Sequence, residues 1–205
     1  MQSFATVQSG NLISIGYFLA EGDMTRIVAA AASVLAFALG ACVCSLFVLW
    51  SSRRRAKYST SVLTFEIGML GGLIAVFLLV PGLDPWWLAW AISFLAGVQG
   101  NAFHREAGML YGNIAVTFVV QMTGSLLGRA IGHRIASDGQ PHLRPAGEYA
   151  LVLLAFAAAG GVGFWLDSLL SVGTLTAASL LLLGLLLPSI RTHGPVDPEQ
   201  NTPTP

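Results

Sequence analysis

Charged side chains are scarce in this sequence. Of its 205 residues only 10% are Asp, Glu, Lys or Arg, whereas a soluble globular domain carries about 25%. The formal net charge is zero, and the basic residues are spread over short segments. The shortage excludes an ordinary soluble domain, and the balance of charge argues against a nucleic-acid partner.

Cysteines and catalytic motifs are also lacking. Cys42 and Cys44 are the only cysteines, and on a helix a spacing of two residues points them about 200° apart. We therefore interpret them as packing residues. No H-E-x-x-H, G-x-S-x-G or Walker A pattern occurs, and the first 20 residues lack the basic start of a signal peptide. We expect no enzyme activity, no catalytic residue, no metal site and no cofactor.

Long apolar runs dominate instead, because 55% of the residues are hydrophobic. Five segments with at most one charge are long enough to cross the roughly 30 Å hydrocarbon core, which takes about 20 residues of helix. The segments are 27–50, 61–80, 86–103, 149–166 and 168–190. They predict an all-α membrane protein. The polar, proline-rich tail at 191–205 is expected to be disordered.

Residues 86–128 form the least regular apolar stretch. The run breaks at 97–101 (GVQGN), resumes, and is interrupted again by Asn113 and by 121–125 (QMTGS). Lipid cannot hydrogen-bond a loosened backbone, so such breaks persist only inside protein or beside water. In transporters, paired broken helices point to the binding site. The alternative is a pair of ordinary spanning helices with a few tolerated polar residues.

The two halves of the chain share short matches in the same order. Residues 4–12 (FATVQSGNL) align with 118–126 (FVVQMTGSL), and LAFA at 35–38 recurs at 154–157. These matches predict a first repeat at 1–80, with a re-entrant segment at 1–20. The second repeat is 86–190, with a re-entrant segment at 109–128. The first repeat has no counterpart of helix 86–103, so we expect longer relatives to begin with such a helix.

Loop charges favour the re-entrant arrangement. If segments 1–20 and 109–128 dip into the membrane and return, nine of the ten Lys and Arg residues lie on one side and only Arg26 on the other. Full crossings would divide them five against five. Because cytoplasmic loops are enriched in Lys and Arg, the first arrangement is preferred. It gives three transmembrane helices per repeat, inverted halves, and a cytoplasmic tail at the inner (plasma) membrane.

Polar residues of the broken segments are the candidate solute site. A Ser or Thr followed by Gly can start a half-helix whose free N–H groups attract anions, and Gly permits close backbone approach. Amide side chains can both donate and accept hydrogen bonds. The alternative is packing of the loops without a ligand. The candidate residues are Ser9, Gly10, Asn11, Gln99, Asn101, Gln121, Thr123, Gly124 and Ser125.

Glu66 is the one carboxylate placed within a predicted span. Intramembrane ionisable groups are functional candidates, although Glu66 is close enough to the basic loop at 53–57 to reach toward it. Together these features predict a transporter or channel for a small polar or anionic solute. The alternative is a structural or accessory membrane subunit, with a membrane enzyme a distant third. The expected partner is the lipid bilayer, and a homo-oligomer is left open.

Three motifs carry a resemblance to a known family. VQSGNLISIG (7–16), GVQGNAF (97–103) and VVQMTGSLLG (119–128) resemble the YoaK-like membrane proteins, defined by a domain of unknown function, number 1275. Ser9, Gly100 and Ser125 depart from the family's motifs, and the family's first helix is absent. The resemblance implies a multi-pass membrane protein and no established activity.

Overall fold

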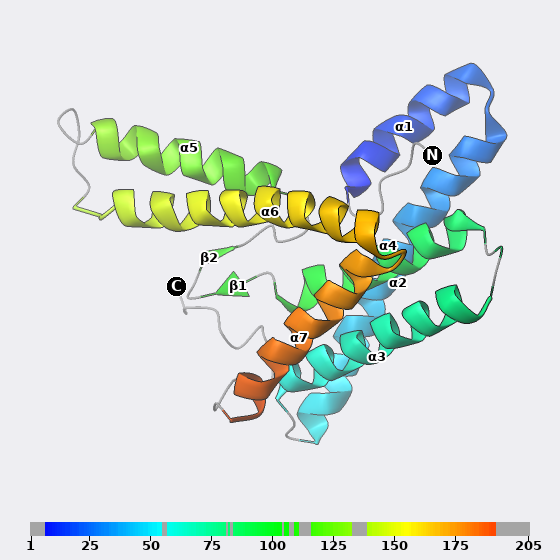
Figure 1. Cartoon of the computed structure of the whole chain (residues 1–205). Coiled ribbons are helices and arrows are strands. Elements are labelled where there is room, and N and C mark those ends of the chain that lie inside the picture. Colours follow the sequence, from blue (N-terminus) through cyan, green and yellow to red (C-terminus); the bar gives the residue numbers. More distant parts are fainter. Residues whose placement is uncertain are drawn as a thin grey trace. The chain divides into compact units, whose positions relative to one another are not determined.

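The chain is helical in a computed structural model that describes residues 7–54, 57–80, 82, 84–103, 105–106, 109–110, 116–132 and 139–191 (Figure 1). Its helices are α1 (Gln8–Glu21), α2 (Met24–Arg53), α3 (Tyr58–Leu79), α4 (Pro85–Ala102), α5 (Thr117–Ile131), α6 (Leu143–Leu169) and α7 (Gly173–Arg191). Two short strands, β1 (Arg105–Glu106) and β2 (Met109–Leu110), pair antiparallel. The predicted helical class is confirmed.

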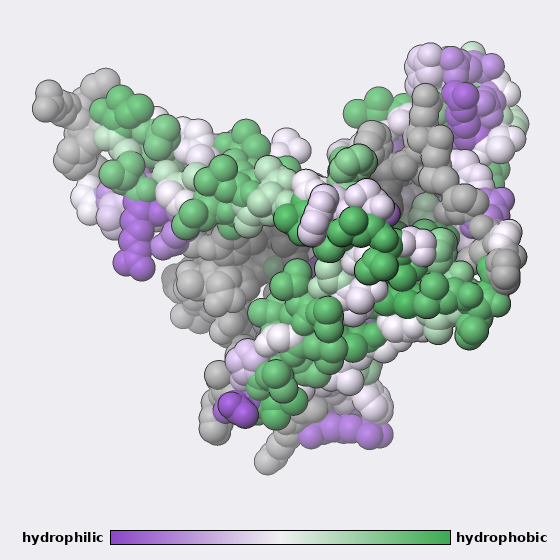
Figure 2. Space-filling model, in the orientation of Figure 1, coloured by the Kyte–Doolittle hydropathy of each residue, from purple (hydrophilic) through white to green (hydrophobic). Residues whose placement is uncertain are grey.

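Four helices of the described ranges are long and apolar enough to cross a membrane: Met24–Ser51, Tyr58–Leu79, Leu143–Leu169 and Gly173–Arg191. Large apolar side chains are exposed along them, and Figure 2 shows hydrophobic surface over the helices, with hydrophilic residues toward their ends. Such a surface is stable in lipid and not in water. The protein is therefore an integral membrane protein.

The fifth predicted span, 86–103, forms α4 but is not one of these four helices. Three tryptophans and the amides of Gln99 and Asn101 lower its mean hydropathy. Asp84 caps its first turn by accepting a hydrogen bond from the Trp86 backbone N–H at 3.0 Å, and Pro85 occupies the first helical position, which needs no N–H donor. The expected break at 97–101 is wrong, because α4 continues to Ala102.

The chain divides into two compact units. Unit 1 comprises Met1–Leu110 and Leu175–Pro205, and unit 2 comprises Tyr111–Thr174. The two predicted repeats are not tested by this division.

In unit 1, α2 and α4 cross at two glycines. A Cβ built on Gly40 would overlap the backbone carbonyl oxygen of Phe94, and one built on Gly97 would overlap that of Phe37. Each glycine thus faces the residue three positions before the other. Small residues let membrane helices approach in this way, so the two backbones are in direct contact at this crossing. Trp90 adds a hydrogen bond from Nε1 to the Ala29 carbonyl oxygen at 3.2 Å.

Also in unit 1, α3 packs against α4 and against the later part of α7. Leu63 and Leu70 of α3 share an apolar cluster with Leu95 of α4 and Leu182 of α7. At one end of this contact the Thr60 and Ser189 hydroxyl oxygens are 2.8 Å apart. Residues from three separate parts of the sequence therefore form one core.

Unit 2 contains α5 and α6, which lie alongside each other (Figure 1). Val119 of α5 and Ala146 and Tyr149 of α6 are buried. After α6, Asp167 Oδ1 accepts the Thr174 backbone N–H at 2.8 Å, and the Thr174 hydroxyl donates to the Gly163 carbonyl at 2.8 Å. These bonds hold the turn that follows α6.

Candidate functional site

Three buried polar side chains connect α1, α2 and α4. Asn11 Nδ2 donates to Ser33 Oγ at 3.1 Å, and Ser33 Oγ lies 2.7 Å from Ser93 Oγ. All three residues have a relative exposure of 0%. We call Asn11, Ser33 and Ser93 the polar bridge. Buried polar groups are costly unless they are paired, so these residues fix how the three helices meet.

The hydrogen bonds of the polar bridge run in one direction. Ser93 Oγ donates its single proton to the Ala89 carbonyl oxygen at 2.8 Å, so Ser33 must be the donor to Ser93. Asn11 Nδ2 has two protons, of which one goes to Ser33 and the other to Gln8 Oε1 at 2.9 Å. The bridge therefore carries donors from α1 toward α4, and each donor has an acceptor in this conformation.

Ser9 and Gly10 lie in the first turn of α1, which begins at Gln8. The helix therefore begins one residue before Ser9. The residue before the helix, Val7, makes no side-chain capping hydrogen bond. The first N–H groups of a helix have no partner within it. This end of α1 lies a few residues from Asn11.

The predicted helix start at Thr123 is wrong. Thr123 lies in the middle of α5, and its hydroxyl donates to the Val119 carbonyl of its own helix at 2.7 Å. A Cβ added at Gly124 would meet nothing within 4 Å, so no close approach occurs at this position among the described residues. A hydroxyl bonded to the carbonyl four residues earlier is compatible with an unbroken helix, which explains why the run does not break.

The other candidate residues divide between the units. Gln99 and Asn101 lie in the last turn of α4, where Asn101 Nδ2 donates to Ser45 Oγ of α2 at 3.1 Å. Asn101 therefore ties α4 to α2, as Ser93 does. Gln121 and Ser125 belong to α5, which is part of unit 2. Asn113 lies outside the described residues.

Glu66 is buried in α3, with a relative exposure of 3%, and neither carboxylate oxygen has a hydrogen-bond partner in the described part of the chain. The expected reach toward the basic loop does not occur among the described residues. Arg54 instead stacks over the Trp50 ring at 4.0 Å. Lys57 Nζ donates to the carbonyl oxygens of Ser189 and Ile190, which end α7.

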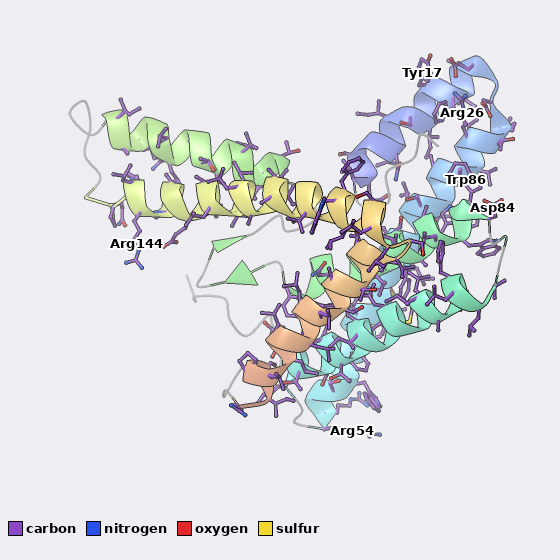
Figure 3. The ribbon with its side chains drawn as sticks, in the orientation of Figure 1. Tyr17, Arg26, Arg54, Asp84, Trp86 and Arg144 are labelled. Carbon is purple, nitrogen blue, oxygen red and sulfur yellow. The ribbon has the colours of Figure 1, made fainter. Side chains whose placement is uncertain are left out.

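Other charged side chains lie near helix ends, as the labelled residues in Figure 3 show. Arg26 Nε lies 3.1 Å from Asp23 at the turn between α1 and α2. Arg144 pairs with Glu148 at 3.1 Å in the first turns of α6. Charges placed at the ends of apolar helices fit a membrane protein whose loops meet water.

Nothing in the described ranges resembles a metal centre, because no group of three His, Cys, Asp or Glu side chains occurs there. An open depression of about 500 Å³ lies between α5 and α6 and is lined in part by Gln140, His142 and Arg144. None of the predicted site residues lines this depression, so it is not part of the candidate site.

Ser33 and Ser93 were missed by sequence reasoning. The available signal was their spacing from the glycines of the helix crossing, because Ser33 precedes Gly40 by seven residues and Ser93 precedes Gly97 by four. Both spacings put the serine on the same helix face as the glycine. A hydroxyl on the face where two helices approach closely is placed to bond across the contact.

Comparison with known proteins gives a family and no described activity. No curated protein and no solved structure matches the chain. The family described as Protein of unknown function (DUF1275) matches residues 1–187, which confirms the resemblance carried by the three motifs. The match covers the seven helices almost to the end of α7. The chain is therefore a member of the DUF1275 family of membrane proteins.

Proposed function

We propose that this protein is a transporter or channel for a small polar solute, and that the polar bridge is part of its binding site. The observation that carries the proposal is the complete burial of Asn11, Ser33 and Ser93 between α1, α2 and α4. Polar groups are expensive inside a membrane and mark solute pathways when they are present. Apolar residues could hold the same crossing at lower cost.

The chemistry of the site favours a solute that accepts hydrogen bonds, anions included. The Asn11 amide, the Ser33 hydroxyl and the first N–H groups of α1 are donors, and the positive end of the helix dipole adds to their attraction for negative charge. Separation of α1 from α2 breaks the bond between Asn11 and Ser33 and frees both groups for a solute. Binding then exchanges one set of hydrogen bonds for another.

A short, mobile α1 is part of this proposal. Its 14 residues span roughly 21 Å, less than the roughly 30 Å hydrocarbon core, as a re-entrant segment requires. Helices α1, α2 and α3 have 14, 30 and 22 residues, and α5, α6 and α7 have 15, 27 and 19. In each half the short helix packs on the long helix that follows. The recurrence supports a repeat, and the distribution of Lys and Arg supports its inversion.

The proposed orientation places the loops at 51–60 and 129–147 and the tail on the cytoplasmic side of the inner membrane. It is supported by the distribution of Lys and Arg over the loops. Reporter fusions inserted in each loop test it. A reporter in 129–147 that becomes active on the outer side contradicts the re-entrant arrangement.

The second candidate function is a structural or accessory membrane subunit. The observation that favours it is the internal pairing of the bridge, in which both amide protons of Asn11 already have acceptors. In that case the polar groups only specify how the helices pack. The two functions differ in whether water ever reaches Ser33.

Cysteine accessibility separates the two functions. A Ser33→Cys variant is made in a background with Cys42 and Cys44 replaced by alanine, and membranes are treated with a water-soluble maleimide. A transporter exposes position 33 during its cycle, so the thiol reacts. In the matched control, Leu35→Cys, the thiol faces lipid, since Leu35 is 69% exposed on an apolar helix, and it stays unmodified. If the thiol introduced by Ser33→Cys is as unreactive as the thiol of the control, the structural subunit is supported instead.

A further inference from the structure

Glu66 is the buried titratable group that the proposed solute site does not use. Three buried residues of α3 share its helix face: Val62, Leu63 and Leu70. They lie four residues before, three residues before and four residues after Glu66, which are the spacings of one helix face. These residues belong to apolar clusters completed by side chains of α2, α4 and α7. The carboxyl is therefore buried on a largely apolar face where α3 meets α2, α4 and α7.

An ionised carboxylate is not stable in these surroundings. Both oxygens lack a hydrogen-bond partner in the described ranges, and an unpaired charge in an apolar interior is too costly to persist. Among the described residues of the basic loop, Arg54 stacks on Trp50 and Lys57 bonds the end of α7, so neither pairs with Glu66. The group therefore needs a bound cation to neutralise it.

A proton fits this position and a metal ion does not. Metal cations such as Ca²⁺ require six or more oxygen ligands, and the valine and leucine side chains around Glu66 supply none. The described residues contain no cluster of three acidic, histidine or cysteine ligands. A proton needs no coordination shell, because it forms a covalent O–H bond.

Few other titratable groups lie near Glu66. The sequence of α4 contains none, and α7 contains none before its last residue, Arg191. From α2, the buried Cys44 thiol interacts electrostatically with Glu66 and hydrogen-bonds the Asn101 side chain. Within α3 itself, Tyr58 lies two turns earlier. Glu66 is thus the one carboxyl in the sequences of α2, α3, α4 and α7.

We propose that Glu66 is a proton-binding site that links proton movement to solute movement. In the described conformation the carboxyl is neutral. When the helices separate and water enters, the O–H bond breaks, the proton passes to a water molecule, and the carboxylate keeps the electron pair. The link to solute rests on the proposed transport function, whereas proton binding at Glu66 does not.

A hydrophobic carbodiimide tests proton binding without any solute. Such reagents modify protonated carboxyls in apolar surroundings, and mass spectrometry locates the product in the full-length protein reconstituted in liposomes. At neutral pH we expect Glu66 to be modified in preference to the exposed Glu21. The modification of Glu66 should be lost when the membranes are held at high pH. The Glu66→Gln variant should show no modification at position 66. Equal or no modification of Glu66 in the folded wild-type protein overturns the proton site.

Solute flux into the same liposomes under a pH gradient tests the link. We expect the pH gradient to drive solute uptake. We also expect a protonophore to abolish that uptake. Uptake indifferent to the gradient overturns the link and leaves the transport function standing. Modified Glu66 in a protein without solute flux overturns the transport function and leaves the proton site standing.

Discussion

Adding one methyl group at the crossing of α2 and α4 should destabilise the protein. In Gly40→Ala the new Cβ overlaps the Phe94 carbonyl oxygen. That oxygen belongs to the backbone of α4 and cannot rotate away, so the helices must separate. Overpacking typically costs about 1–3 kcal/mol, and overlap with a backbone atom puts Gly40→Ala at the upper end, about 2–3 kcal/mol, against a gain of about 1 kcal/mol from the helix propensity of alanine.

The net expectation for Gly40→Ala is a loss of about 1–2 kcal/mol in the free energy of unfolding. At roughly 2–4 °C per kcal/mol for a chain of this size, the melting temperature falls by roughly 2–8 °C. Thermal unfolding of the purified protein in detergent measures the shift. The matched control is Gly68→Ala on α3, where an added Cβ meets nothing within 4 Å, and this variant should melt at or above the wild-type temperature.

A second variant checks that the effect belongs to the crossing. Gly97→Ala overlaps the Phe37 carbonyl in the same contact, so it should destabilise by a similar amount. The double variant should lose less than the sum, because the helices separate once and residues in contact are not additive. Gly40→Ala melting at or above the wild-type temperature, or Gly68→Ala falling as far, refutes the reasoning.

Three further variants test individual hydrogen bonds by the same melting assay. Ser33→Ala leaves a buried Asn11 proton without its acceptor and should cost about 1–3 kcal/mol, and an unchanged melting temperature contradicts the polar bridge. Lys57→Met removes two bonds to carbonyls at the end of α7 and should cost about 0.5–1.5 kcal/mol, whereas no loss shows that these bonds stabilise nothing. Thr123→Val removes only a bond within its own helix and should change stability by less than about 0.5 kcal/mol, so a large loss means that Thr123 packs against something further.

Much of the fold follows from the sequence because its determinants are local. Apolar length is enough to locate the four long helices, and small residues such as Gly40 indicate where a neighbouring helix approaches. The end of α1 is set by Gly22, which adopts a positive φ of 75° that other residues rarely accept. Each of these features depends on a few consecutive residues.

The candidate site was less predictable because its partners are distant in sequence. Ser33 and Ser93 are 60 residues apart, and neither lies in a conspicuous motif. The errors at Gly97 and Thr123 have one cause, which is that a membrane helix tolerates Gly and Thr without breaking. The low helix propensity of Gly97 is offset by its close packing on α2. The Thr123 hydroxyl bonds a backbone carbonyl of its own helix. Whether such residues break a helix depends on neighbours that local sequence does not reveal.

Solute uptake by Ser33→Ala tests most directly whether the polar bridge binds the transported solute. Uptake into liposomes is measured for wild-type protein and two variants, with the solute chosen by thermal stabilisation across a panel of small polar and anionic compounds. The control is Ser179→Ala, whose hydroxyl bonds the Leu175 carbonyl of its own helix. If the bridge binds solute, Ser33→Ala raises the KM for uptake about tenfold, the equivalent of about 1.4 kcal/mol, and Ser179→Ala leaves it unchanged. A lower melting temperature for Ser33→Ala with an unchanged KM would contradict the claim and assign the bridge to packing alone.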